Sequence, residues 1–154
     1  MVDSKVYATG CNESGQLGIG STVNCSFEPV LVPGLDNVRT ISAWNSSAAI
    51  TDQNELFVWG SENNGLSPTL YESKRNLSKV KVGGKFTLVT DLSNKMFTLA
   101  SDQGLEPVPS LEDYCATQAG VGANFAFVVG DSVSEVQPFT TRSPKSLSPE
   151  PRKN

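Results

Sequence analysis

The sequence VYATGCNESGQLGIG, residues 6–20, carries the strongest structural signal in this chain of 154 residues. It begins with a short run of β-forming residues and continues into a turn with four glycines, Gly10, Gly15, Gly18 and Gly20. Glycine permits positive φ angles and close approach of the backbone. Leu17 can anchor such a turn on a sheet below it. We therefore expect a strand followed by a tight turn packed on a β-sheet.

Short runs rich in Val, Ile, Thr and Phe recur along the chain between Gly, Asn, Asp, Ser or Pro. Turn residues return roughly every 8 to 12 positions, the spacing of sandwiches, barrels and propellers. No window keeps the apolar period of an amphipathic helix, and helical turns fit best at Leu70–Leu77 and Ser110–Ala116. The predicted strands are Lys5–Thr9, Val38–Ser42, Ala48–Thr51, Glu55–Trp59, Val80–Val82, Thr87–Thr90, Lys95–Leu99 and Asn124–Val129.

The chain repeats itself at a spacing of 39 residues. Identical residues then coincide at Gly65/Gly104, Leu66/Leu105, Pro68/Pro107, Val82/Val121, Gly83/Gly122, Phe86/Phe125, Val89/Val128 and Ser93/Ser132. Ordinary composition would give roughly two matches over such a window, so the register reflects a true repeat. Phe86 and Phe125 are expected to pack between repeats. A side chain at Gly83 or Gly84 would crowd the neighbouring repeat.

A third copy lies upstream, because Val6–Gly10 matches Leu56–Gly60 and Met96–Ala100. Each unit reads as a strand, a Gly-rich turn, a proline-bounded connection, two strands, a turn and a strand. That is about four strands in roughly 40 to 50 residues, the content of one propeller blade. We predict a repeat domain over residues 1–137, with units of about 5–54, 55–94 and 95–132. Residues 138–154 form a basic Ser/Pro tail that we expect to be disordered.

These residues resemble the repeat family named for the regulator of chromosome condensation, whose repeat runs V-Y-x-W-G-x-N-x-x-G-Q-L-G-x-G. Residues 6–20 match it with Thr9 in place of the usual tryptophan, and residues 56–60 match the next start. The family's usual histidine is replaced by Ser46, Phe86 and Phe125. The resemblance implies a partial or open β-propeller, since the family commonly closes seven blades and this chain supplies about three. The chain is then a truncated form of a longer parent, a propeller completed by self-association or by another chain, or a small open domain.

The resemblance also implies function. Some members of the family are exchange factors for Ran-like small GTPases, and many others are scaffolds that dock proteins. We expect a protein-binding scaffold or regulator, with guanine nucleotide exchange as the alternative. Loops carry binding on propellers because the strands are committed to the sheets. The candidate contact segments are therefore Ser21–Glu28, Ser61–Leu66 and Ser101–Glu106, and the expected partner is a protein, including a small GTPase.

The composition argues against an enzyme, a cofactor and a metal site. There is no histidine, which removes histidine-based acid–base catalysis and most catalytic zinc sites. The acids Asp102 and Glu112-Asp113 read as ordinary loop surface. The turn Gly15–Gly20 lacks the Gly-Lys-Ser/Thr ending of a phosphate-binding loop. We assign no catalytic, cofactor-binding or metal-binding residues.

Charge, hydropathy and cysteine content limit the partners and the cellular compartment that we expect for this chain. Residues 1–137 hold 15 acids and 8 bases, so the body should repel nucleic acid. There is no run of about 18 apolar residues, and no secretory signal is expected. Three cysteines, Cys11, Cys25 and Cys115, are predicted to be buried thiols in a reducing compartment, the cytoplasm or the nucleus. Four N-x-[ST] triplets read as polar turns. In the tail, Ser143-Pro144 and Ser148-Pro149 are candidate sites for proline-directed kinases.

Overall fold

The computed structural model describes residues 4–22, 24–60, 65–71, 75–100 and 104–132. These residues form an all-β fold, as predicted, with one three-residue 3-10 helix, η1 (Pro109–Leu111). The strands are β1 (Tyr7–Cys11), β2 (Cys25–Leu31), β3 (Val38–Ala43), β4 (Ser47–Thr51), β5 (Leu56–Trp59), β6 (Thr69–Tyr71), β7 (Leu77–Val82), β8 (Thr87–Asp91), β9 (Met96–Ala100), β10 (Gly104–Pro107), β11 (Tyr114–Val121) and β12 (Ala126–Ser132). The tail, residues 138–154, and its two Ser-Pro pairs lie outside the described residues.

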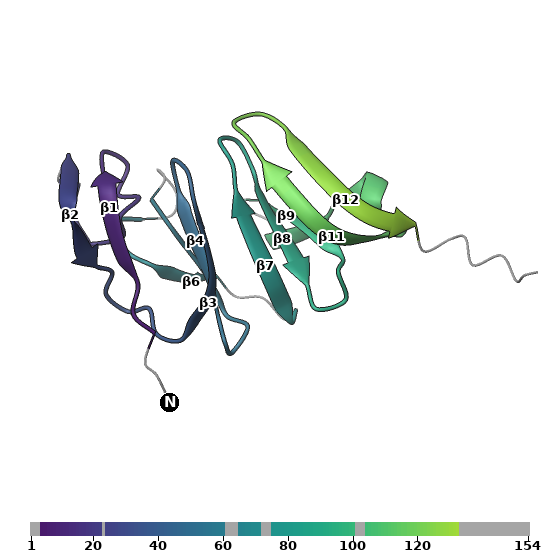
Figure 1. The fold of residues 1–154 in the computed structure, drawn as a ribbon, viewed down its shortest axis with the longest axis horizontal. Coiled ribbons are helices and arrows are strands. Elements are labelled where there is room, and N and C mark those ends of the chain that lie inside the picture. The colour runs from purple at the N-terminus through teal and green to yellow at the C-terminus, as the bar shows by residue number, and fades with distance from the viewer. Residues whose placement is uncertain (1–3, 23, 61–64, 72–74, 101–103, 133–154) are drawn as a thin grey trace, which may run out of the picture.

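The strands form four antiparallel sheets that follow one another in chain order across the molecule (Figure 1). Two sheets are complete four-stranded blades, β3-β4-β5-β6 and β7-β8-β9-β10. The sheets at the two ends of this array have two strands each. We call β1–β2 the N-terminal half-blade and β11–β12 the C-terminal half-blade. Together these sheets form the open array of propeller blades that the repeat predicted.

The sheets do not begin where the sequence units begin. Strands β3 and β4 lie in unit 5–54, whereas their partners β5 and β6 lie in unit 55–94. The next blade likewise joins β7 and β8 to β9 and β10 from unit 95–132. Each complete blade is therefore built from two sequence units. For the same reason the array begins with the last two strands of one blade, β1 and β2, and ends with the first two strands of another, β11 and β12.

Neighbouring sheets are held together by apolar side chains between their faces. The largest such core joins the two complete blades and contains Ile50 and Val58 from one blade and Val80 and Val89 from the other. A second core joins β8 and β9 to the C-terminal half-blade. A third places Ala8 of β1, together with Val6 just before that strand, against the first complete blade. Burial of apolar surface between successive blades thus stabilises the array.

The glycine-rich turn is fixed by one buried polar side chain and one tryptophan. Asn12 is fully buried, and its amide donates to the carbonyl of Ser21 at 2.6 Å and accepts from the backbone N–H of Leu17 at 2.9 Å. Leu17 is buried, as expected. The indole of Trp59 donates to the carbonyl of Gln16 at 3.0 Å. A Cβ at Gly18 would come within 2.6 Å of that indole nitrogen, so the close approach requires glycine.

Two expectations about packing are confirmed and one is wrong. A Cβ at Gly83 would come within 2.3 Å of Val121, and one at Gly84 within 2.5 Å of the Ala123 carbonyl oxygen. Phe86 packs in the core beside the C-terminal half-blade. Phe125 was expected to pack between blades as well, but it is 58% exposed because no further sheet in the described part of the chain covers it.

The first of the two predicted helical turns, Leu70–Leu77, is wrong over the residues described, since residues 72–74 lie outside them, and the second, Ser110–Ala116, is confirmed in part. Residues 69–71 form strand β6, and β7 begins at Leu77. The segment Ser110–Ala116 contains the end of η1 but then enters strand β11 at Tyr114. At residues 69–71 pairing with β5 overrides the weak local preference, because an edge strand gains its hydrogen bonds from the sheet rather than from its own composition. In the second segment the helical turn forms and strand β11 follows it.

Candidate protein-binding surfaces

Of the three loop segments proposed for binding, the structure describes one almost completely. Residues 61–64 and 101–103 lie outside the described residues, so the binding roles of those turns stay predictions. The segment Ser21–Glu28 runs into strand β2, and only residue 23 is outside the described part. Phe27 lies in this segment and is 92% exposed, the highest value among the large apolar side chains that the structure describes.

Local hydrogen bonds hold the backbone around Phe27 in place. The hydroxyl of Ser26 donates to the carbonyl of Glu28 at 2.7 Å, and Thr9 of the neighbouring strand donates to the carbonyl of Ser26 at 2.8 Å. The phenyl ring is therefore presented from an ordered strand rather than from a loose loop. An apolar ring fixed in this way loses little entropy on binding, which is how aromatic anchors act in protein interfaces.

A groove of about 500 Å³ lies between β1 and the first complete blade. Residues of β1 and of the end of β3 line it, together with buried Leu17, Val32 and Trp59. Several of the side chains that line it are large, apolar and exposed, namely Tyr7 (62%), Ile41 (49%) and Trp44 (51%). The groove is thus an apolar surface next to the outer edge of β1, which is paired with β2 on its other side.

A second apolar surface lies at the opposite end of the array. Phe125, Phe127 and Val129 of the C-terminal half-blade are 58%, 71% and 60% exposed. The rings of Phe125 and Phe127 meet edge to face with their centroids 5.5 Å apart. Exposed apolar side chains gathered in this way mark interaction sites. The sequence signal for this surface was the expectation that Phe125 packs between blades.

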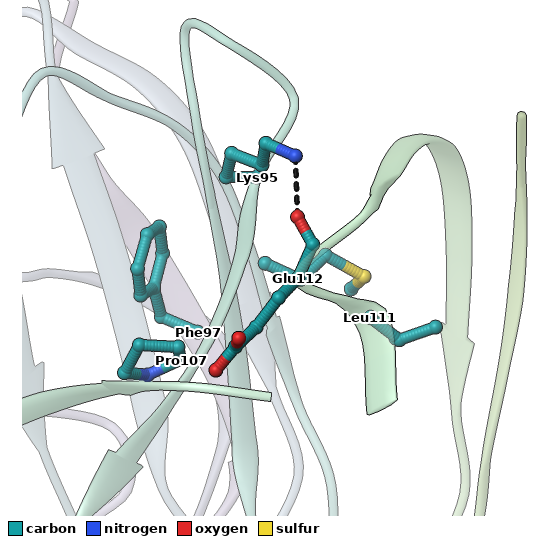
Figure 2. Close-up of a pocket in the computed structure, with 6 residues that line it drawn as sticks. Lys95, Phe97, Pro107, Leu111 and Glu112 are labelled. Atoms are coloured by element: carbon teal, nitrogen blue, oxygen red, sulfur yellow. Dashed lines mark hydrogen bonds between the residues drawn. The ribbon is translucent and has the colours of Figure 1, made fainter. Parts of the chain in front are cut away.

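Figure 2 shows a smaller hollow of about 170 Å³ between β9, β10 and the segment that follows η1. Phe97, Pro107 and Leu111 line it with apolar atoms, and the ammonium group of Lys95 donates to the backbone carbonyl of Glu112. Because Lys95 is engaged with the backbone, the hollow offers no paired acid and base. The hollow lies where the last complete blade contacts the connection that leads into the C-terminal half-blade.

Two of the three acidic residues considered for catalysis lie within the described part of the chain. Glu112 and Asp113 are exposed on the connection before β11, and Asp102 lies outside the described residues. Over the described ranges, there is no group of three or more Cys, Asp or Glu side chains that could hold a metal ion. The same ranges contain no helix long and apolar enough to cross a membrane.

The prediction of buried cysteines is wrong for two of the three. Cys11 and Cys25 are exposed and Cys115 is half-buried. Cys11 and Cys25 face each other across β1 and β2, with their sulfur atoms 3.4 Å apart. The hydrogen bond with Cys11 raises the pKa of the Cys25 thiol, with smaller contributions from burial and from the charges of Cys11 and Glu13. The sequence spacing gave no sign of this pair because strand pairing creates it.

Comparison with known proteins agrees with the resemblance seen in the sequence. Residues 3–49 match the family model of the regulator of chromosome condensation (RCC1) repeat. The regulator of chromosome condensation of Homo sapiens is 38% identical over 85 residues, which cover 51% of this chain and 20% of that protein. The ultraviolet-B receptor UVR8 of Arabidopsis thaliana is 34% identical over 80 residues, 51% of this chain and 18% of the receptor. The match thus spans about a fifth of each relative's length.

The fold is similar to that of a solved propeller. The crystal structure of Prp20p from Saccharomyces cerevisiae, described with its binding properties to Gsp1p and histones, superposes with a TM-score of 0.71. The sequences are 14% identical in this superposition, which covers 86% of this chain and 41% of Prp20p. At this identity the likeness establishes the shared fold.

Proposed function

We propose that this chain, which carries an RCC1 repeat in residues 3–49, is a non-enzymatic scaffold or regulator that docks other proteins. Proteins built from RCC1-like repeats act as protein-interaction regulators, and some are exchange factors for Ran. The observation that carries the proposal is Phe27, which is 92% exposed on a backbone whose neighbouring carbonyls, those of Ser26 and Glu28, accept hydrogen bonds. It lies in a segment that is also a loop candidate on sequence grounds alone.

The charge around Phe27 indicates the chemistry of its partner. Glu28 follows it directly, and Glu13 lies at the same end of the hairpin, two residues beyond Cys11, which pairs with Cys25. The body as a whole carries 15 acids against 8 bases over residues 1–137. We therefore propose a protein partner with an apolar pocket rimmed by basic residues, since complementary charge guides docking. The nucleus and the cytoplasm are the compartments we propose for this interaction.

Guanine nucleotide exchange is the second candidate, favoured by the likeness to Prp20p, whose structure is described with its binding to Gsp1p. An exchange factor needs no acid–base chemistry of its own, because it stabilises the nucleotide-free form of the GTPase. The chain matches about two fifths of Prp20p, however, and so presents less of a propeller face. For this reason docking comes first.

Affinity capture from native extract tests both candidates. The chain is compared with Phe27→Ala and with a control, Leu92→Ala, whose side chain is 58% exposed in another part of the array. Docking through Phe27 predicts that the retained partner disappears with Phe27→Ala and persists with Leu92→Ala. An identical set of retained proteins for all three chains would contradict the proposal.

The same capture is run with EDTA and with excess GTP and magnesium. A scaffold retains its partner under both conditions. A small GTPase retained with EDTA and released by GTP would make exchange the leading function instead, because an exchanger binds the nucleotide-free state most tightly.

A further inference from the structure

We propose that the groove beside β1 binds the C-terminal half-blade of a second copy of this chain. Strands β11 and β12 of one copy would there complete the blade that β1 and β2 of the other copy begin. This inference rests on the proposed docking function and names one partner for it, the chain itself. It differs from the Phe27 contact, which lies outside the groove.

The register of the strands shows which part of a blade each half-blade represents. Strands β3, β7 and β11 are the first strands of their sheets. Each pairs with the strand that follows it, and in each pair the register shifts once, at the equivalent position. The irregularity lies between Val38/Thr40, Leu77/Lys79 and Ala116/Gln118, positions spaced by 39 residues. The C-terminal half-blade therefore consists of the first and second strands of a blade.

The N-terminal half-blade consists of the other two strands. Residues 6–10, which contain most of β1, match residues 56–60 in the third strand of the first complete blade. Strand β2 pairs with β1 as β6 pairs with β5. Within the described residues the two half-blades are thus complementary pairs of strands, and in the order β11-β12-β1-β2 they make one four-stranded blade.

The faces of the half-blades are complementary as well. In the complete blades, Val80 of β7 is buried against Ala48 and Ile50 of the blade before it. Ile41 holds the same position in β3, yet it is 49% exposed in the groove because the sheet that precedes it in the described part of the chain has two strands, β1 and β2. An apolar side chain placed for burial between blades is therefore left uncovered.

The missing cover has its counterpart at the other end. Leu88 of β8 packs in the core that it shares with the C-terminal half-blade and is 6% exposed. Phe127 lies 39 residues further on in β12 and is 71% exposed. Placed in the groove, Phe127 would meet Ile41 of the second copy as Ala48 meets Val80 within one chain. Both exposed apolar surfaces would then be buried by one contact.

The pairing of the two edges follows from the same repeat. In the complete blades Ala48 lies opposite Val58, and Leu88 lies opposite Thr98. The equivalent pair across the junction is Phe127 of one copy and Ala8 of the other. Within the described residues, β12 pairs with β11 alone and β1 with β2 alone, so both edges offer backbone groups to a further strand.

The contact is head to tail, and two copies would close it. The described part of each copy contains two complete blades and two half-blades. Two copies therefore make a ring of six blades, within the range of roughly four to eight blades found in propellers. A head-to-tail contact that closes gives a defined oligomer rather than an open filament. The predicted species is a dimer.

The molar mass of the purified chain of 154 residues in solution tests this inference without any other protein. At about 100 µM, where an interface of ordinary size is occupied, we expect twice the mass of one chain, which is 16.4 kDa. Ile41→Lys and Phe127→Glu should each raise the dissociation constant of the dimer by about tenfold or more, because each buries an unpaired charge. Leu92→Glu is the matched control, an exposed apolar position outside the groove and outside the C-terminal half-blade, and should leave the dimer intact.

Mixing the two defective variants distinguishes the head-to-tail contact from any other dimer. In a mixed dimer one junction pairs Lys with Glu and the other keeps the original Ile41 and Phe127, so dimers should form again. Far-UV circular dichroism checks that the variants stay folded, as their exposed positions predict. A monomeric wild-type chain, a dimer indifferent to both substitutions, or a mixture that stays monomeric would overturn the inference. None of these results bears on partner capture through Phe27.

Discussion

Phe86 and Phe125 occupy the same position in successive repeats, 39 residues apart, but their surroundings differ. Phe86 packs into the core between the last complete blade and the C-terminal half-blade, whereas Phe125 is 58% exposed. The difference reflects position in the array rather than sequence, because a sheet lies beyond Phe86 and none of the described sheets lies beyond Phe125. The same contrast recurs between Val80 and Ile41 at the other end.

This contrast predicts unequal costs for the same substitution. Phe86→Ala removes a partly buried ring from the core and should lower the free energy of unfolding by about 2 kcal/mol. Phe125→Ala removes an exposed ring whose edge contact with Phe127 is the interaction lost. It should therefore lower the free energy of unfolding by less than about 1 kcal/mol. Urea unfolding at low protein concentration, where the chain is monomeric, measures both values. Equal costs would show that the two rings are buried alike.

The two tryptophans offer a second comparison. Trp59 is buried and donates to the carbonyl of Gln16, whereas Trp44 is 51% exposed. Trp59→Phe keeps an aromatic ring but loses that donor and some volume, so it should lower the free energy of unfolding by about 1 to 2 kcal/mol. Trp44→Phe should stay within about 0.5 kcal/mol of the wild type. Chemical denaturation followed by circular dichroism avoids reliance on tryptophan fluorescence, and a larger loss for Trp44→Phe would contradict the packing described.

Asn12 is predicted to be the polar side chain on which the glycine-rich turn depends. Asn12→Ala removes hydrogen bonds to Ser21 and Leu17 and leaves their backbone groups without that partner in a buried site. The expected loss is about 2 to 3 kcal/mol of unfolding free energy. Asn24→Ala is the control, because Asn24 begins another N-x-[ST] triplet and is exposed; its cost should be below about 0.5 kcal/mol. An Asn12→Ala protein as stable as the wild type would show that the turn does not depend on the Asn12 hydrogen bonds.

The Cys11–Cys25 pair predicts a shifted pH dependence of thiol alkylation. Its hydrogen bond favours the protonated thiol, so the pKa of Cys25 is raised and its reaction with iodoacetamide should begin at higher pH than for an ordinary cysteine. Cys11→Ala removes the largest cause and should move the midpoint of Cys25 alkylation to lower pH. Mass spectrometry of the peptide that contains Cys25 measures the rate at each pH. An unchanged midpoint in Cys11→Ala would show that Cys11 does not cause the shift.

Much of the fold follows from particular residues in the sequence. The repeat at 39 residues and the turn of residues 6–20 predicted an array of blades, because turn glycines and strand spacing are local signals. Strands β2 and β10 were missed, since each contains a proline that reads as a connection, and an edge strand tolerates one. Strand β11 was missed because its Ala, Gln and Gly residues have little β propensity.

The candidate surfaces were harder to predict, for a physical reason. The periodic sequence assigns Ile41 and Phe127 to positions between blades, where repeat proteins bury apolar side chains. Whether such a position is covered depends on which strands the chain supplies on either side. The sequence units also begin at a different strand from the sheets. The two half-blades can therefore be recognised from the strand pairing but not from the sequence repeat. Phe27 was within a predicted loop, but its exposure depends on the pairing of β2 with β1.

The central claim is that β12 of one copy pairs with β1 of another in the register of the complete blades, and disulfide formation tests that register. In a chain whose three cysteines are changed to serine, Ala8→Cys with Phe127→Cys should give a dimer linked between copies on mild oxidation, because opposed residues in a sheet bring their Cβ atoms within bonding range of a disulfide. Tyr7→Cys with Phe127→Cys is the control, because a shift of one residue places the side chains on opposite faces. Tyr7 is 62% exposed, so random collision would favour the control. The account predicts rapid linkage for position 8 and little for position 7; equal linkage for both pairs, or faster linkage for position 7, would contradict it.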